Sequence, residues 1–248
     1  MRNILLKIEY DGTDYAGWQS QKNAKSIQDT IEAALKRITG REARLISCGR
    51  TDAGVHALSL FANFKTEAKI PLFKLQRGLN SVLPKDIAIK EVKEVPLEFN
   101  SRFDAKSKLY RYTIMNGPSR SAMSGNFTVY IPYKLDVALM KKEAKVLVGK
   151  HDFKSFQAAD KVKRSSIRTI KKFSIKKKGE AIIIDVEADG FLYNMVRNIA
   201  GTLIDIGRDR LPYGSMARIL KAKDRKFAGA TAPARGLCLM EVKYDLFL

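Results

Sequence analysis

The chain has 248 residues, 45% hydrophobic and 29% charged, so it can form a real core and is not a disordered protein. Lysine and arginine outnumber aspartate and glutamate by 46 to 26, and the net charge of +20 favours nucleic acid over a membrane surface as partner. Two cysteines exclude a disulfide framework, and the lack of a signal peptide or an apolar run of membrane length predicts a cytoplasmic protein.

The first half of the chain alternates predicted strands and helices in the order β-α-β-β-α-β. Apolar residues alternate along Arg2–Tyr10, which is typical of a strand. Ser26 and Asp29 have the spacing of a capping box, and apolar residues at helical spacing follow them. A second helix is predicted over residues 72–79 and a strand over Ile87–Val95. This order predicts a compact sheet with helices on one face.

One stretch of the first half, Gly49-Arg50-Thr51-Asp52-Ala53-Gly54-Val55-His56-Ala57, stands between two apolar runs. Its two glycines bracket a single carboxylate, and glycine allows a positive φ or a close approach of the backbone to a ligand. We expect Asp52 to be presented on a tight turn. A plain β-hairpin tip is the alternative, because Asp and Gly are ordinary turn residues.

The second half again mixes strands with helices. Residues 99–105 have no clear period, so we place the domain boundary there, with one half at 1–104 and the other at 105–248. Strands are predicted at 109–115, 167–175, 181–188 and Leu237–Tyr244, and helices at 135–148, 191–206 and 213–221. The expected fold class is α+β, with two similar halves, each a mostly antiparallel sheet with helices on one face, and an active-site cleft between them.

Most familiar catalytic motifs are missing from the chain. It has no His-Glu-x-x-His pair, no phosphate-binding loop, no Gly-x-Gly-x-x-Gly and no cluster of carboxylates, so we expect neither a metal nor a cofactor. What remains is a lone carboxylate, Asp52, in a basic protein. To act as a nucleophile it must stay ionised, and a neighbouring arginine favours the charged form.

Two arginines are candidates for that neighbour. Arg50 is near in sequence, whereas Arg197 lies off the apolar arc of the 191–206 helix, on a side that carries few charges. A structural or snorkelling role for Arg197 is the alternative.

Aromatic and basic residues of the second half could contact RNA. Tyr110 and Tyr112 flank Arg111 and share one face of a predicted strand, where their rings could stack on bases or belong to the core. A dense basic run is either a solvated face or a track for phosphates. It comprises positions 134, 141, 142, 145, 150, 154, 161, 163, 164, 168, 171, 172, 176, 177 and 178.

The stretch around Asp52 resembles the signature of the TruA-type tRNA pseudouridine synthases. Further blocks resemble this family in the same order along nearly the whole chain. They are residues 10–13 and 17–21, 26–28, 80 with 83–87, 101–105, 110–112, 151–156, 191–198, and 232–237. The chain departs from the family at Leu60, where Gln is frequent, and at Asn100, where His is frequent.

The resemblance implies a pseudouridine synthase fold and an isomerase that converts uridine to pseudouridine without a cofactor. It implies that Asp52 is the nucleophile, that Arg197 pairs with it, and that Arg50 helps to hold the displaced nucleotide. Tyr110 and Leu237 would enclose the target base. The implied substrate is the anticodon stem-loop of tRNA at positions 38–40, and the implied assembly is a homodimer.

Two other functions fit the same residues. One is a non-catalytic RNA-binding protein in which the Asp52 turn is structural, and the other is a synthase that acts on a different RNA, such as rRNA. Asp52 could attack or deprotonate the sugar, or add to the base. An assay on unmodified tRNA, with sequencing of the pseudouridine positions, would distinguish the isomerase from the two other functions.

Overall fold

The computed structural model describes residues 1–159 and 165–245, which form two compact units. One unit is Met1–Lys106 with Leu239–Leu248, and the other is Ser107–Cys238. Most of the last strand, from Leu239 on, belongs to the first unit, where it hydrogen-bonds beside β3 (His56–Thr66). Pairing between such distant segments leaves no local pattern in a sequence. Lys161, Lys163 and Arg164 of the basic run lie outside the described residues.

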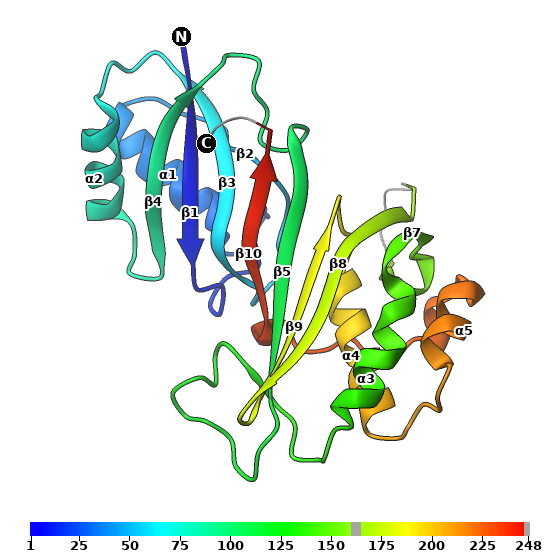
Figure 1. The fold of residues 1–248 in the computed structure, drawn as a ribbon. Helices are drawn as coiled ribbons and strands as arrows, with labels where there is room; N and C mark the ends of the chain where they lie inside the picture. The colour runs from blue at the N-terminus through cyan, green and yellow to red at the C-terminus, as the bar shows by residue number, and fades with distance from the viewer. Residues whose placement is uncertain (160–164, 246–248) are drawn as a thin grey trace. The chain divides into compact units, whose positions relative to one another are not determined.

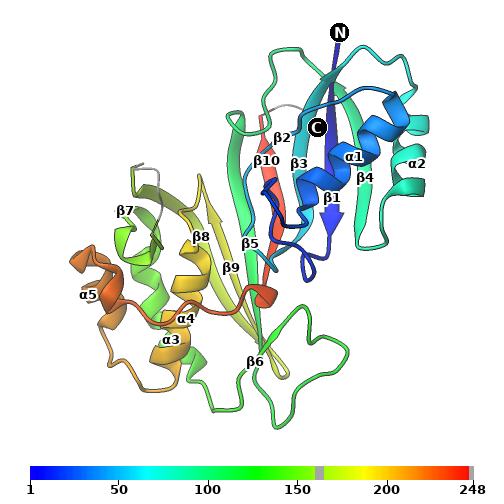
Figure 2. The ribbon, with the colours of Figure 1, turned by 180° about the vertical axis from the view of Figure 1, so that it is seen from behind.

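The first unit has an antiparallel sheet in which β1 (Arg2–Tyr10) lies between β3 and β4 (Ile87–Val95). A short β2 (Ile46–Ser47) also pairs with β3, and β10 (Leu237–Tyr244) lies on the other side of it. Helix α1 (Ile27–Thr39) covers one face of this sheet, behind it in Figure 1 and in front of it in Figure 2, and α2 (Leu72–Val82) lies beside the edge strand β4 in both views. The predicted β-α-β-β-α-β order is therefore confirmed.

The core of the first unit lies between this sheet and its helices. Ile4, Leu6 and Ile8 alternate along β1 and are completely buried, as are Ile31 and Leu35 of α1. Burying one such side chain contributes about 1.5–3 kcal/mol. The helix begins as the capping box predicts: the Ser26 hydroxyl accepts a hydrogen bond from the Asp29 backbone N–H at 3.0 Å.

In the second unit, antiparallel strands follow one another in the order β5 (Ala105–Met115), β9 (Ala181–Ala188), β8 (Ile167–Lys178) and β7 (Gly149–Asp152). A short β6 (Val129–Tyr130) pairs with β5 in parallel. Its helices are α3 (Val137–Ala144), α4 (Met195–Gly207) and α5 (Ser215–Ala222), and single 3-10 turns follow at 145–147, 154–156, 225–227 and 234–236. The α+β class with mostly antiparallel sheets is confirmed.

Two predicted helices differ from the structure. The helix expected to reach Gly149 ends at Ala144, and Val148, expected on its apolar side, is 45% exposed. The buried side instead includes Glu143, whose carboxylate accepts backbone N–H groups of Gly214 (2.7 Å) and Met216 (2.9 Å) at the start of α5. A buried carboxylate in that position breaks the apolar pattern from which the helix was predicted.

Helix α4 starts at Met195, four residues later than predicted. Asn194, which precedes it, has φ 59°, a left-handed conformation that interrupts a helix and that Asn tolerates better than most residues. The apolar residues 191 and 192 therefore belong to the approach to the helix.

Within residues 1–159 and 165–245, every helix is too short or too polar to cross a membrane. Nor does this part of the chain gather three or more His, Cys, Asp or Glu residues in a way that could hold a metal ion.

The packing of α4 makes a prediction about Gly201. A Cβ atom at this position would overlap the carbonyl oxygen of Ala230, which is backbone and has little freedom to move. We expect Gly201→Ala to lower the free energy of unfolding by about 1–3 kcal/mol or more, measured by urea denaturation.

Gly78→Ala in α2 is the matched control, because its Cβ would meet only the Ile38 side chain, at 3.3 Å. The gain in helix propensity should keep that change within about 1 kcal/mol of neutral. Equal stability of the two variants would contradict the tight contact between α4 and the segment around Ala230.

Candidate active site

Asp52 lies in the connection between β2 and β3, in the first unit. The backbone turns sharply here, and the Val55 N–H donates to the Asp52 carbonyl at 3.2 Å. Gly54 has the positive φ expected of the glycines (73°), whereas Gly49 does not. Asp52 is half-buried and Arg50 is exposed. Residues 48–55 separate β2 from β3, so the connection is a long loop rather than the tip of a tight hairpin.

The loop that follows β1 supports the Asp52 turn. The Trp18 N–H donates to the Thr51 carbonyl at 3.1 Å, and the Gly54 N–H donates to the Tyr15 carbonyl at 3.2 Å. Gly17 has φ 96°, and a Cβ there would lie 2.5 Å from the Thr51 carbonyl oxygen. Only glycine fits both that conformation and that approach. The backbone on both sides of Asp52 is therefore held by residues about 35 positions earlier in the chain.

This supporting loop is itself fastened to the core. Tyr15 and Trp18 are 3% and 2% exposed. The Trp18 ring lies beside the Tyr10 ring in the core. The Gln28 N–H donates to the Trp18 carbonyl at 2.9 Å, which ties the loop to the first turn of α1. Burial, together with the 2.7 Å hydrogen bond to Asp86, raises the pKa of the Tyr15 phenol, so that its hydroxyl remains a donor.

Arg197 lies in the second unit, in the first turn of α4, and its guanidinium has defined partners. Its Nε–H donates to the Ala232 carbonyl at 2.8 Å, and Nη1 donates to Asn194 Oδ1 at 2.9 Å. The Ala232 N–H in turn donates to the Arg197 carbonyl at 3.2 Å. The segment around Ala232 therefore covers this side of α4, which explains why the side carries few charges. Arg197 is half-buried rather than spread on a solvated face.

The same segment is fastened to α4 by Asn198, which is completely buried. Its side-chain N–H donates to the Phe156 carbonyl at 2.8 Å, and its Oδ1 accepts from Thr231 (2.6 Å) and Arg225 (3.1 Å). A fully bonded polar group of this kind rigidifies its surroundings. The chain that leads to Leu237 is thus held at several points along α4.

Tyr110 and Tyr112 lie on one face of β5, as predicted, and both are buried. Arg111 points to the other face, where its guanidinium holds Asp185 at 2.7 and 2.9 Å. The Tyr110 ring packs edge-on against Phe191, with ring centroids 5.0 Å apart. Tyr110 is 8% exposed and Leu237 is 6% exposed.

The phenol of Tyr112 donates to the Pro233 carbonyl at 2.9 Å. Burial raises the pKa of Tyr112, against the opposing effect of the positive charges of Arg197 and Arg235. The hydroxyl therefore stays protonated and anchors the segment that precedes Leu237.

Three residues that hold this region, Asn194, Asn198 and the hydroxyl of Tyr112, were not predicted from the sequence. The alternation along β5 placed Tyr112 beside Tyr110 but could not show what its hydroxyl meets. Asn194 and Asn198 lie three positions before and one position after Arg197, and Asn is a poor helix former inside an apolar helix. That mismatch is the one signal in the sequence that could have indicated them.

The five predicted site residues are divided between the units. Arg50 and Asp52 belong to the first, and Tyr110, Arg197 and Leu237 belong to the second. The lysines of the basic run on β8 are exposed at positions 171, 172, 176, 177 and 178.

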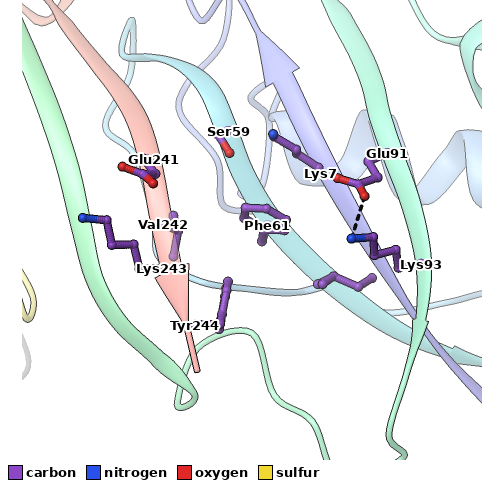
Figure 3. A pocket seen from close by; sticks show the side chains of 10 residues that line it. Lys7, Ser59, Phe61, Glu91, Lys93, Glu241, Val242, Lys243 and Tyr244 are labelled. Atoms are coloured by element: carbon purple, nitrogen blue, oxygen red, sulfur yellow. Dashed lines mark ion pairs between the residues drawn. The ribbon is translucent and has the colours of Figure 1, made fainter. Parts of the chain in front are cut away.

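A hollow of about 390 Å³ lies on the first unit, over β1, β3, β4 and β10 (Figure 3). Charges of both signs line it: Lys93 pairs with Glu91 at 2.9 Å, and Phe61 meets Tyr244 edge-on on its floor. None of the predicted site residues lines it. Its mixed charges are also unlike those of a phosphate site, so it does not mark the active site.

The anchoring of the segment before Leu237 predicts that Tyr112→Phe is destabilising. The variant keeps the ring but leaves the Pro233 carbonyl without its donor, so the free energy of unfolding should fall by about 1–2 kcal/mol in urea denaturation.

Tyr130→Phe is the matched control, because Tyr130 also donates to a proline carbonyl, that of Pro118 at 3.1 Å, but in an exposed place. Its effect should stay within about 0.5 kcal/mol. If Tyr112→Phe were as mild, the Pro233 bond would have no anchoring role.

Comparison with known proteins gives a match to a family described as tRNA pseudouridine synthase, over residues 7–104 and 144–245. The tRNA pseudouridine synthase A of Caldicellulosiruptor bescii is 50% identical, covering 98% of this chain and all of the relative. Proteins of the same name from Thermoanaerobacter sp. and Geotalea daltonii are 47% and 49% identical, with the same coverage.

Solved structures give a much weaker match. A Cbf5-Nop10-Gar1 complex aligns at 10% identity with a TM-score of 0.37, covering 95% of this chain and 57% of the other. The archaeal box H/ACA sRNP Nop10-Cbf5 complex aligns at 13% identity with a TM-score of 0.35, covering 81% of this chain and 44% of the other.

Proposed function

Since this chain belongs to the tRNA pseudouridine synthase family, a family of isomerases, we propose that it converts uridine to pseudouridine at positions 38–40 of the tRNA anticodon stem-loop. The observation that carries this proposal is identity of 50% along 98% of the chain to a tRNA pseudouridine synthase A. The net charge of +20 supports a polyanionic substrate. The target nucleotide must leave the stem before reaction, because its glycosidic bond is inaccessible in a stacked helix.

Asp52 is the proposed nucleophile. It is the only carboxylate between Glu42 and Glu67, and a turn with defined backbone bonds presents it, half-buried. The isomerisation breaks the bond from C1′ to N1 and forms one from C1′ to C5. The proton lost from C5 is balanced by the one gained at N1, so no oxidant or cofactor is consumed. A carboxylate serves this sequence by attacking or deprotonating the sugar or by adding to the base, and in each case it must be ionised.

Arg197 is the proposed partner of that carboxylate. The bonds to Ala232 and Asn194 set the orientation of its guanidinium, which lowers the entropy lost when it binds a carboxylate. A planar guanidinium can hold a carboxylate through two parallel hydrogen bonds.

The remaining residues would handle the nucleotide. We propose that Arg50, exposed two positions before Asp52, holds the displaced nucleotide, and that Tyr110 and Leu237 enclose the target base. Their support is their position in the family motifs. The ring of Tyr110 is held by Phe191 and would enter the contact without losing further side-chain freedom.

We also propose that the enzyme is a cytoplasmic homodimer. The support is the resemblance to the family. Light scattering should give twice the chain mass of 27.9 kDa, and a mass equal to one chain would contradict the dimer.

The direct test of the function is an assay on unmodified tRNA, with sequencing of the pseudouridine positions. We expect modification at 38–40 by the wild-type enzyme and none by Asp52→Asn, whose amide has nearly the same shape but is a far weaker nucleophile. The tRNA affinity of the variant should stay unchanged.

Glu42→Gln is the control, since it removes the same charge from an exposed position and should keep full activity. Substantial turnover by Asp52→Asn would remove Asp52 from the mechanism. Tight tRNA binding by the wild type without any isomerisation would indicate a non-catalytic RNA-binding protein, and modification of rRNA alone would indicate a different substrate.

The pairing with Arg197 predicts a distinct pattern for two variants. Arg197→Lys keeps the charge but loses the planar fork, so turnover at saturating tRNA should fall by about 10-fold or more while affinity changes little. Arg197→Met should be worse, and its activity profile should move to higher pH, because the carboxylate loses the charge that favours its ionised form.

Arg210→Met, at an exposed position, removes the same charge and is the control. It should lower only tRNA affinity, with a weaker dependence on salt. The same behaviour in both Arg197 variants would assign Arg197 to phosphate binding.

A further inference from the structure

We propose that Tyr10 is a positioning residue for Asp52, acting through a hydrogen bond between its hydroxyl and that of Thr51. The two oxygens are 2.8 Å apart, and the residues are 3% and 7% exposed. This inference rests on the proposed role of Asp52 as the nucleophile.

The backbone of Tyr10 is restrained by the sheet, so its side chain can hold the Asp52 turn in place. Tyr10 is the last residue of β1, where the neighbouring strands pair with it on both sides, opposite Ala57 on β3 and Ile87 on β4. The pairing of β1 with β3 shifts register between Ile8 and Tyr10, and irregularities of this kind redirect the side chains beside them. The phenol thus reaches from the end of the sheet into the connection that carries Asp52.

Thr51 immediately precedes Asp52, so the hydrogen bond between Tyr10 and Thr51 would restrain the position of Asp52. The Thr51 carbonyl accepts the Trp18 N–H at 3.1 Å, and its hydroxyl meets Tyr10. With both groups bonded, neither the side chain nor the peptide between Thr51 and Asp52 rotates freely. The remaining turn bond, from the Val55 N–H to the Asp52 carbonyl, fixes the other side.

A side-chain bond is needed here because the turn has no ladder of backbone bonds. The connection leaves the sheet after β2 and rejoins it at His56, so the sheet itself restrains only its ends. A nucleophile must be held close to its productive position, and a shift of about 1 Å can cost about 100-fold in rate.

A merely stabilising role makes a different prediction. If the hydroxyl pair served only the fold, its loss would lower the melting temperature and leave the turnover number of the folded enzyme unchanged. A positioning role lowers turnover at saturating tRNA while leaving tRNA affinity intact, because it affects the reacting group rather than the RNA contacts.

Tyr10→Phe and Thr51→Val each remove one hydroxyl while keeping the shape of the side chain. We expect each to lower the turnover number by about 10-fold, with tRNA affinity within about 2-fold of wild type. The double variant should be no slower than the worse single variant, because both remove the same interaction. Thr51→Ser keeps the hydroxyl and should restore most of the turnover.

Tyr244→Phe is the matched control, since it removes another tyrosine hydroxyl of the same unit, one that donates to the Ser101 carbonyl at 2.9 Å. It should lower stability without changing turnover. All rates are taken per folded enzyme, with folding checked by circular dichroism.

Normal turnover in both Tyr10→Phe and Thr51→Val would overturn the proposal, as would failure of Thr51→Ser to outperform Thr51→Val. An Asp52→Asn enzyme measured in parallel tests the proposed nucleophile separately from the positioning role of Tyr10. An active Asp52→Asn enzyme refutes the proposed nucleophile. An inactive one alongside normal hydroxyl variants refutes only the positioning role.

Discussion

The turn that carries Asp52 is held in place by the loop that follows β1, and the proposed chemistry of the first unit depends on this support. The backbone around Asp52 belongs to no strand, so its polar groups need partners elsewhere when they are buried. The loop from Tyr10 to Trp18 supplies them, and Gly17 allows the approach because a side chain there would collide with the Thr51 carbonyl. The loop in turn is bonded to the start of α1, so the position of Asp52 depends on the core beneath it.

In the second unit, side chains rather than a backbone loop hold an irregular segment in place. The segment from Arg225 to Leu237 is mostly irregular, and α4 holds it through Arg197 and the buried Asn198. Tyr112 fastens it again from the sheet. Polar residues inside an otherwise apolar helix are costly unless every group is bonded, and here they bond to backbone carbonyls and to neighbouring side chains. The bonds to Ala232 and Asn194 give the guanidinium of Arg197 a fixed orientation.

The two units also differ in how charge is used. In the first unit, charges of both signs line the hollow over the sheet, and Lys93 pairs with Glu91. In the second, exposed lysines crowd β8, while the acidic residue opposite Arg111 is taken up by a bidentate pair. Positive charge attracts a polyanion over a distance of about 10 Å at ordinary ionic strength.

The sequence by itself determined the elements whose pattern is local. The bounds of β1, β4 and β10, the capping box of α1 and the face shared by Tyr110 and Tyr112 all follow from alternation or from a cap, each of which spans a few residues. The family followed from motifs in a fixed order, which the comparisons bear out. Only the tertiary structure decided that β10 lies beside β3, because pairing between strands about 180 residues apart has no local signature.

The partners of the site residues were likewise decided by tertiary structure alone. Nothing near Thr51 in the sequence indicates Tyr10, and nothing near Arg197 indicates Ala232. The helix expected to reach Gly149 ends at Ala144, and its buried Glu143 caps the start of a different helix. A sequence records which groups need hydrogen bonds, but the three-dimensional path of the chain determines which groups provide them.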